Sequence, residues 1–386
     1  GFAGAGAAQA LQAASGAAAG AVESACGAVY VCGSNNSLSG LAGGRGRAFD
    51  TVERYNPLLG GWELLPEMLH LRRSGSLVTV RGRIYVCGGV SCESPTGAVM
   101  EEPVSSAECF DPMTWKWTKL PPMLEPRVSA ALQAADGCLY VCGGCNWKEL
   151  KTAERYDPVA NRWSALPLML QPRSFGHLAL VGDSLILCGG FGNFGVWAFA
   201  EQLELHREGP WQALRPMLRS RISAAVAVIS RRLFICGGST SSRTLRDVEC
   251  YSPDVGEWQL MPPLLTERSG CSSAVVGRCL YVFGGAGRQG ALSSVERLDA
   301  GAGRWEALEL MSRSRVSSTV AVVGRSLYIF GGNNSSHEPM SSAERLDLAR
   351  GLWEALPPML SQRIRVTSCV GLQAQMQRAP ALCLED

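Results

Sequence analysis

The sequence predicts an all-β protein, a seven-bladed β-propeller with four antiparallel strands in each blade. Three observations predict this fold: a four-part motif recurs seven times, its period is nearly constant, and no helical pattern of 10–15 residues interrupts it. Small four-stranded sheets cannot bury both faces alone, so repeats of this kind are expected to pack radially around an axis.

The first recurring part is an apolar run that ends in Gly-Gly. A first copy, Val29–Ser34, has serine in place of the second glycine, and the intact copies are Ile84–Gly89, Leu139–Gly144, Leu185–Gly190, Leu233–Gly238, Leu280–Gly285 and Leu327–Gly332. A glutamate-centred segment follows each run, and a tryptophan lies nine residues after the glutamate, or ten in the fourth copy. These tryptophans are Trp62, Trp117, Trp163, Trp211, Trp258, Trp305 and Trp353, 46–48 residues apart after a first interval of 55.

Each copy predicts four strands. The first follows an arginine, the second is the apolar run, the third alternates around the glutamate and the fourth carries the tryptophan. We expect the glycine pairs to end the second strand at positive φ and the tryptophans to fill the gaps between blades. Blade one, with Ser34, and blade four, with Leu203 in place of an aromatic residue, are expected to be the most distorted.

The chain divides into three parts. Residues 1–24 are an Ala/Gly-rich low-complexity segment, residues 25–373 form the propeller, and residues 374–386 are a tail. The strand Arg363–Leu372 resembles the first strand of an eighth unit, so we predict that it closes the ring as the innermost strand of blade one. Ala18–Val22 competes for that position, but it is poor in β-branched residues.

Composition limits the function classes. Hydrophobic residues make up 46% of the chain and the formal net charge is +2, which gives no electrostatic footprint for nucleic acid or a membrane surface. No apolar run reaches the length of a membrane-spanning helix. Fifteen scattered cysteines indicate free thiols in a reducing compartment, so we expect a cytoplasmic protein.

The Gly-Gly, Glu-x-Tyr and Trp residues at these offsets resemble the kelch repeat, and most of all the kelch-like family, over residues 25–373. The resemblance implies a non-enzymatic module that binds a peptide or protein partner at the mouth of the central channel. One role that it implies is substrate recognition in a cullin-type ubiquitin ligase adaptor, whose other domains lie upstream of the propeller. The alternatives are a stand-alone scaffold that binds actin or organises a signalling complex, and a cofactor-free sugar isomerase.

An arginine precedes each first strand, where the links between blades and the loops between second and third strands share one face. The seven are Arg73, Arg127, Arg173, Arg221, Arg268, Arg315 and Arg363. Either each arginine pairs with a third-strand glutamate, or several point into the mouth and bind an acidic or phosphorylated motif. The resemblance implies that a hydroxyl two residues before the glutamate also contributes, at Thr51, Ser106, Thr152, Ser294 and Ser342.

The other motifs in the sequence give little indication of function. The segment Gly285–Gly290 matches GxGxxG, but a strand rather than a helix is predicted after it, which argues against dinucleotide binding. Cys142 and Cys145 match CxxC, yet Cys142 occupies a buried position of the repeat. Neither a catalytic constellation nor a metal or cofactor site is predicted. The long loops Gly33–Asp50 and Gly89–Ser105 are expected to overhang the arginine face and take part in recognition.

Overall fold

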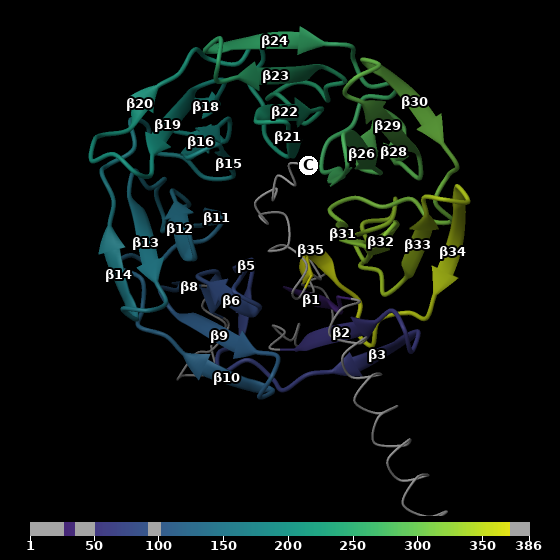
Figure 1. The fold of residues 1–386 in the computed structure, drawn as a ribbon, viewed down its shortest axis with the longest axis horizontal. Coiled ribbons are helices and arrows are strands. Elements are labelled where there is room, and N and C mark those ends of the chain that lie inside the picture. The colour runs from purple at the N-terminus through teal and green to yellow at the C-terminus, as the bar shows by residue number, and fades with distance from the viewer. Residues whose placement is uncertain (1–26, 35–50, 92–101, 371–386) are drawn as a thin grey trace, which may run out of the picture.

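The computed structural model describes residues 27–34, 51–91 and 102–370, and all regular elements of this part are strands. Seven four-stranded antiparallel sheets are arranged like blades around a central axis (Figure 1). The predicted all-β, seven-bladed propeller is therefore confirmed. The segments 1–24 and 374–386, the competing strand Ala18–Val22 and most of the long loops of blades one and two lie outside the described residues.

The strands of each blade follow one another from the axis outwards. The innermost strands of blades 1 to 7 are β35 (Ile364–Val370), β5 (Ser76–Val80), β11 (Ala131–Ala135), β15 (His177–Val181), β21 (Ala225–Ile229), β25 (Ser272–Val276) and β31 (Thr319–Val323). The second strands are β1 (Val29–Ser34), β6 (Arg83–Cys87), β12 (Cys138–Cys142), β16 (Ser184–Cys188), β22 (Arg232–Cys236), β26 (Cys279–Phe283) and β32 (Ser326–Phe330).

The outer half of each blade completes the repeat. The third strands are β2 (Val52–Asn56), β9 (Ala107–Asp111), β13 (Ala153–Asp157), β19 (Ala200–Glu204), β23 (Val248–Ser252), β29 (Val295–Asp299) and β33 (Ala343–Asp347). The outermost are β3 (Gly61–Leu64), β10 (Lys116–Lys119), β14 (Arg162–Ala165), β20 (Gln212–Ala213), β24 (Glu257–Met261), β30 (Arg304–Leu308) and β34 (Leu352–Leu356). Seven two-residue strands lie outside the blades: β4 (Arg72–Arg73), β7 (Val90–Ser91), β8 (Glu102–Pro103), β17 (Phe191–Gly192), β18 (Gly195–Val196), β27 (Ala286–Gly287) and β28 (Gly290–Ala291).

The C-terminal strand closes the ring. Strand β35 pairs antiparallel with β1, from Val29 opposite Val370 to Ser34 opposite Ile364, so the first and the last strand that the structure describes share blade 1 (Figure 1). The register shifts between Cys32 and Ser34, which agrees with the expected irregularity of this blade. The prediction of closure by the C-terminal strand is confirmed.

Side chains of neighbouring blades form the core. One cluster, for example, joins Tyr85 of blade 2 to Leu139 and Trp163 of blade 3. The Trp163 indole nitrogen donates to the carbonyl of Pro121 in the preceding link at 2.9 Å, and the six other repeat tryptophans make the same type of bond to the link before them. Blade 4 keeps this bond through Trp211, although its outer strand shrinks to two residues.

The Gly-Gly pairs follow the second strands at positive φ, as predicted. Gly143 and Gly144 have φ of 64° and 89°. A Cβ on Gly143 would lie 2.4 Å from the carbonyl oxygen of Arg173 in the next link. This close approach sets the glycine pair of blade 3 directly against the link to blade 4, where only glycine fits.

Candidate functional site

The links between blades and the loops between second and third strands meet at one end of the axis, which we call the mouth face. This follows from antiparallel strands that run alternately toward and away from that end. The turns between first and second strands, and between third and fourth strands, lie on the opposite face. Every arginine singled out in the sequence lies in or directly after a link, on the mouth side.

An arginine and a glutamate of the same blade form a buried pair in all seven blades. The pairs are Arg363 with Glu53, Arg72 with Glu108, Arg127 with Glu154, Arg173 with Glu201, Arg221 with Glu249, Arg268 with Glu296 and Arg315 with Glu344. None of these arginines is more than 3% exposed and none of the glutamates more than 2%. We call each pair a clamp.

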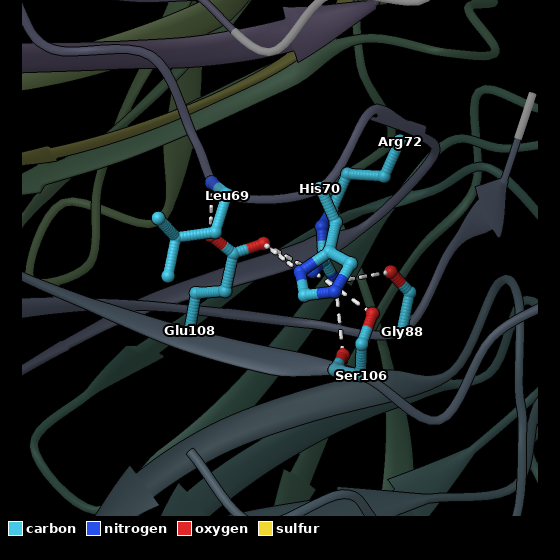
Figure 2. Close-up of polar contacts among 6 residues, drawn as sticks. All are labelled: Leu69, His70, Arg72, Gly88, Ser106 and Glu108. Atoms are coloured by element: carbon cyan, nitrogen blue, oxygen red, sulfur yellow. Dashed lines mark hydrogen bonds and ion pairs between the residues drawn. The ribbon is translucent and has the colours of Figure 1, made fainter. Parts of the chain in front are cut away.

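Figure 2 shows the clamp of blade 2. The Arg72 guanidinium donates through Nη2 to Glu108 Oε1 at 2.5 Å and through Nη1 to the carbonyls of Gly88 and Ser106, both at 2.9 Å. The second oxygen of Glu108 accepts the backbone N–H of Leu69 at 2.6 Å. One clamp therefore joins the link, the Gly-Gly loop and the third strand of its blade.

The other blades repeat this network. The second carboxylate oxygen accepts a link N–H at 2.6–2.7 Å in every blade. In blades 3 to 7 arginine Nη1 donates to the carbonyl of the first glycine of the pair at 2.6–3.0 Å. Burial lowers the pKa of Arg173, and the Glu201 carboxylate opposes that shift. Each buried charge thus faces an opposite charge, as burial requires, while the Nε atoms of Arg72, Arg127, Arg173 and Arg221 are buried without a hydrogen-bond partner among the described residues.

The structure corrects two expectations about the arginines. The interpretation of an open ring that receives an anion is wrong for Arg127, Arg173, Arg221, Arg268, Arg315 and Arg363, because each side chain is buried and its fork already holds a carboxylate. In blade 2 the clamp arginine is Arg72 and not Arg73, which follows it in β4. Arg72 lies ten residues after Trp62, the spacing found in every other blade, and that signal identifies it.

The predicted hydroxyl positions belong to the same network. Thr51, Ser106, Thr152 and Ser294 each accept a hydrogen bond from arginine Nη2 at 2.9–3.1 Å. Ser342 contributes its backbone carbonyl to Arg315 instead. These five residues are half-buried, so their contact with a partner stays a prediction.

A second set of arginines is exposed on the mouth face. The loops of blades 5 and 6 border a cleft of about 790 Å³, and its charged lining residues are Arg219, Arg243, Arg246, Asp247, Glu267 and Arg288. We call it the Arg cleft. Its four arginines are exposed, and among the residues that the structure describes they form no ion pair. Four cations against two carboxylates leave the cleft with a charge of +2.

The repeat pattern does not indicate the Arg cleft, because the four arginines of the cleft do not occupy repeat positions. Arg288 lies in the segment Gly285–Gly290, which forms the hairpin β27–β28, so a strand rather than a helix follows these glycines, as predicted. The signal available in the sequence was the concentration of arginine in two consecutive loops, Arg243 with Arg246 and then Arg288.

The other motifs play structural parts. Cys142 is buried, burial raises the pKa of its thiol to about 12, and it carries no disulfide. Among the described residues no group of three His, Cys, Asp or Glu side chains is placed to hold a metal ion. Nor does any helix long and apolar enough to cross a membrane occur in this part of the chain.

The stability of the folded chain depends on pH through His177, which lies on the mouth side. Burial and the nearby Arg221 charge lower the pKa of this imidazole to about 4, and its Nε2 faces the backbone N–H of Ala224 at 3.4 Å. The unfolded chain takes up a proton on this histidine near pH 6.5, whereas the folded chain does so only near 4. Stability contributed by neutral His177 is therefore lost as the pH falls from 6.5 to 4.

We expect His177→Gln to flatten the pH dependence in that window. Urea unfolding at pH 7.0, 5.5 and 4.5 measures it, and the wild type should lose more free energy of unfolding than the variant at each step. Equal losses in both proteins would show that His177 titrates as it does in water.

Comparison with known families agrees with the geometry. A family model described as the KLHDC2/KLHL20/DRC7 Kelch-repeats domain matches residues 199–375, and the Kelch motif matches residues 71–124 and 126–170. The chain is a kelch-repeat β-propeller. Kelch-repeat propellers are protein-interaction modules, in agreement with the predicted binding role.

Individual relatives cover short stretches of this kelch propeller. Kelch-like protein 23 of Pongo abelii is 28% identical over 108 residues, 28% of this chain and 17% of that protein. Kelch-like ECH-associated protein 1A of Danio rerio is 30% identical over 107 residues, 27% of this chain and 17% of that protein. The matches thus span less than a fifth of these relatives. The solved structure of YjhT has a TM-score of 0.56 and 15% identity, and the match covers 67% of this chain and 91% of that one, which shows a shared fold.

Proposed function

We propose that this kelch propeller binds a protein partner by seating an acidic or phosphorylated segment in the Arg cleft. The observation that supports this proposal is the cleft itself: four exposed arginines without ion-pair partners among the described residues, three of them in two short loops and Arg219 in the link between blades 4 and 5. Guanidinium groups bind carboxylates and phosphates through paired N–H donors. The clamps take no part in this contact, because their arginines are already paired.

The loops that carry the cations are themselves braced by the fold. The backbone of Thr240 donates to the carbonyl of Arg243 at 2.9 Å, and Leu245 donates to Gly238 at 2.8 Å. In blade 6 the hairpin β27–β28 presents Arg288 at its tip. A braced loop loses little conformational freedom when a ligand binds, which favours recognition at this position.

The proposed role in the cell follows the kelch-like relatives: the propeller recognises the substrate of a cullin-type ubiquitin ligase adaptor. A scaffold that binds actin or organises a signalling complex would use the same face. The two roles differ in the domains that accompany the propeller rather than in the Arg cleft.

Replacing the cleft cations is expected to weaken acidic ligands. The probe is a fluorescein-labelled decapeptide of alternating Glu and Ser, beside its phosphoserine form and a neutral form with Gln in place of Glu. In fluorescence polarisation at 0.15 M salt, the triple variant R243S/R246S/R288S should bind the charged peptides at least about tenfold more weakly than the wild type. Affinity should fall further as salt increases.

A control removes the same charge elsewhere. Arg81, Arg231 and Arg325 are exposed in turns between first and second strands, on the opposite face. The triple variant R81S/R231S/R325S should bind the charged peptides like the wild type. Equal weakening in both triple variants would mean that net charge alone attracts the peptide, and the proposed site would be wrong.

A further inference from the structure

The loop between the second and third strands of blade 4 is rich in aromatic residues and contains no charged one. It runs over residues 189–199, and the hairpin β17–β18 folds it back on itself. Phe191 is 41% exposed and Phe194 is 91% exposed. The Phe194 ring meets Trp197 edge-on with centroids 6.3 Å apart, so it rests on the loop and not in the core. Exposed aromatic side chains on a mouth-face loop indicate recognition rather than packing.

Phe175 adds a third exposed ring under an unusual backbone constraint. Its φ is 54° and its side chain is 46% exposed. The equivalent residue, two positions after the clamp arginine, also has positive φ in other blades, where it is small: Ser74, Ser129, Ser223, Gly270 and Ser317. A bulky side chain is unfavourable in this left-handed region, and an exposed ring gains little from burial. The fold therefore gives no reason for phenylalanine at position 175.

Backbone hydrogen bonds bring these phenylalanines together. Ser174 and Phe191 exchange two bonds, at 2.9 and 2.8 Å, which sets Phe175 next to the β17–β18 hairpin. The Phe175 N–H in turn donates to the Ser129 carbonyl at 3.1 Å, toward the neighbouring blade. We call Phe175, Phe191 and Phe194 the aromatic rim.

A backbone hydrogen bond joins the loop that carries Phe191 and Phe194 to the link that carries Arg219. The backbone N–H of Arg221 donates to the carbonyl of Trp197 at 3.1 Å, and Arg219, two residues earlier, lines the cleft. The uncharged loop of blade 4 thus ends where the basic surface of blades 5 and 6 begins. One extended ligand that lies across the mouth face can meet both.

We propose that the aromatic rim is a second subsite that takes an apolar side chain from the acidic segment bound in the Arg cleft. This inference rests on the proposed function. The chemistry of the two surfaces identifies the ligand. The positively charged cleft binds carboxylates or phosphates, and the uncharged rings bind an aromatic or large aliphatic side chain. The ligand class is a polypeptide with an acidic cluster followed or preceded by one bulky apolar residue.

The test extends the acidic decapeptide by one phenylalanine. Spacers of none, two, four or six alternating Gly and Ser residues separate it from the Glu-Ser stretch, at either end, and a matched set has serine in place of phenylalanine. At a favourable spacer length the phenylalanine peptide should bind the wild type at least about tenfold more tightly than its serine match in fluorescence polarisation. No gain at any length would overturn the inference.

Two variants locate the gain. In F175S/F194S the phenylalanine advantage should vanish, while the plain acidic decapeptide binds as before. Serine is the residue that blades 3 and 5 carry at the position of Phe175, so the fold should tolerate it, and an unchanged thermal melting curve checks this. The control is Met113→Ser: Met113 is 84% exposed in a turn of the opposite face, and its loss should leave the advantage intact. An advantage that survives in F175S/F194S would overturn the inference.

The outcomes separate the two proposals. If the plain acidic peptide binds and depends on Arg243, Arg246 and Arg288, but phenylalanine adds nothing, the aromatic subsite is wrong and the proposed function stands. If no charged peptide binds the wild type, the proposed function fails and the inference fails with it. If a Gln-Ser peptide with phenylalanine binds as tightly as the acidic one, the rim acts without the cleft, and the linked site is wrong.

Discussion

Replacing Arg268 by methionine is expected to lower the free energy of unfolding by about 3–5 kcal/mol. Arg268 is fully buried, and it donates to Glu296, to the Gly284 carbonyl at 2.8 Å and to the Ser294 carbonyl at 3.1 Å. Its removal leaves the Glu296 carboxylate buried without a cation. Urea unfolding followed by tryptophan fluorescence measures the loss.

Two further variants distinguish the effect of losing the clamp from the effect of losing any arginine. In the double variant R268M/E296L no charge is left unpaired, so it should recover part of the stability that R268M loses. Arg304 is exposed in β30, and Arg304→Ser should change the free energy of unfolding by no more than about 0.5 kcal/mol. If R268M had the same free energy of unfolding as R304S, the clamp would not contribute to the stability of the fold.

Removing the closing strand is expected to abolish cooperative unfolding of the ring. Truncation after Gln362 deletes β35, which supplies the innermost strand of blade 1, and Arg363, whose guanidinium holds Glu53 at 2.8 Å. Blade 1 then keeps three strands, and the backbone edge of β1 that faces the axis loses its hydrogen-bonding partner. Circular dichroism melting and small-angle X-ray scattering should show a broad transition and a larger radius of gyration.

Truncation after Leu372 serves as the matched control, because it retains β35 in full. This protein should melt like the 386-residue chain. If the protein truncated after Gln362 melted at the same temperature with the same sharpness, the ring would not depend on closure by the C-terminal strand.

The seven blades and their closure could be predicted because the repeat specifies the four strands of a blade seven times, whereas the short strands outside the blades were not predicted. Gly-Gly, Glu and Trp recur at fixed offsets, and each offset corresponds to one strand of a blade. The clamp was only half predictable. The sequence placed Arg and Glu at matching repeat positions, but whether a guanidinium turns toward the axis or toward the third strand depends on side-chain conformation in the packed blade.

The candidate site could not be found from the repeat, since its residues depart from the repeat. Arg243, Arg246 and Arg288 lie in loops whose lengths and sequences differ between blades. The aromatic composition of residues 189–199 was visible in the sequence, yet the exposure of Phe194 and the positive φ of Phe175 required the structure.

Hydrogen–deuterium exchange with the acidic peptide bound tests most directly whether ligands meet the exposed arginines of the Arg cleft. We expect slower exchange in the loops around residues 239–247 and 286–291 at saturating peptide, with the turns of the opposite face unchanged. Protection confined to the opposite face, or no protection at saturation, would contradict this account of the kelch propeller.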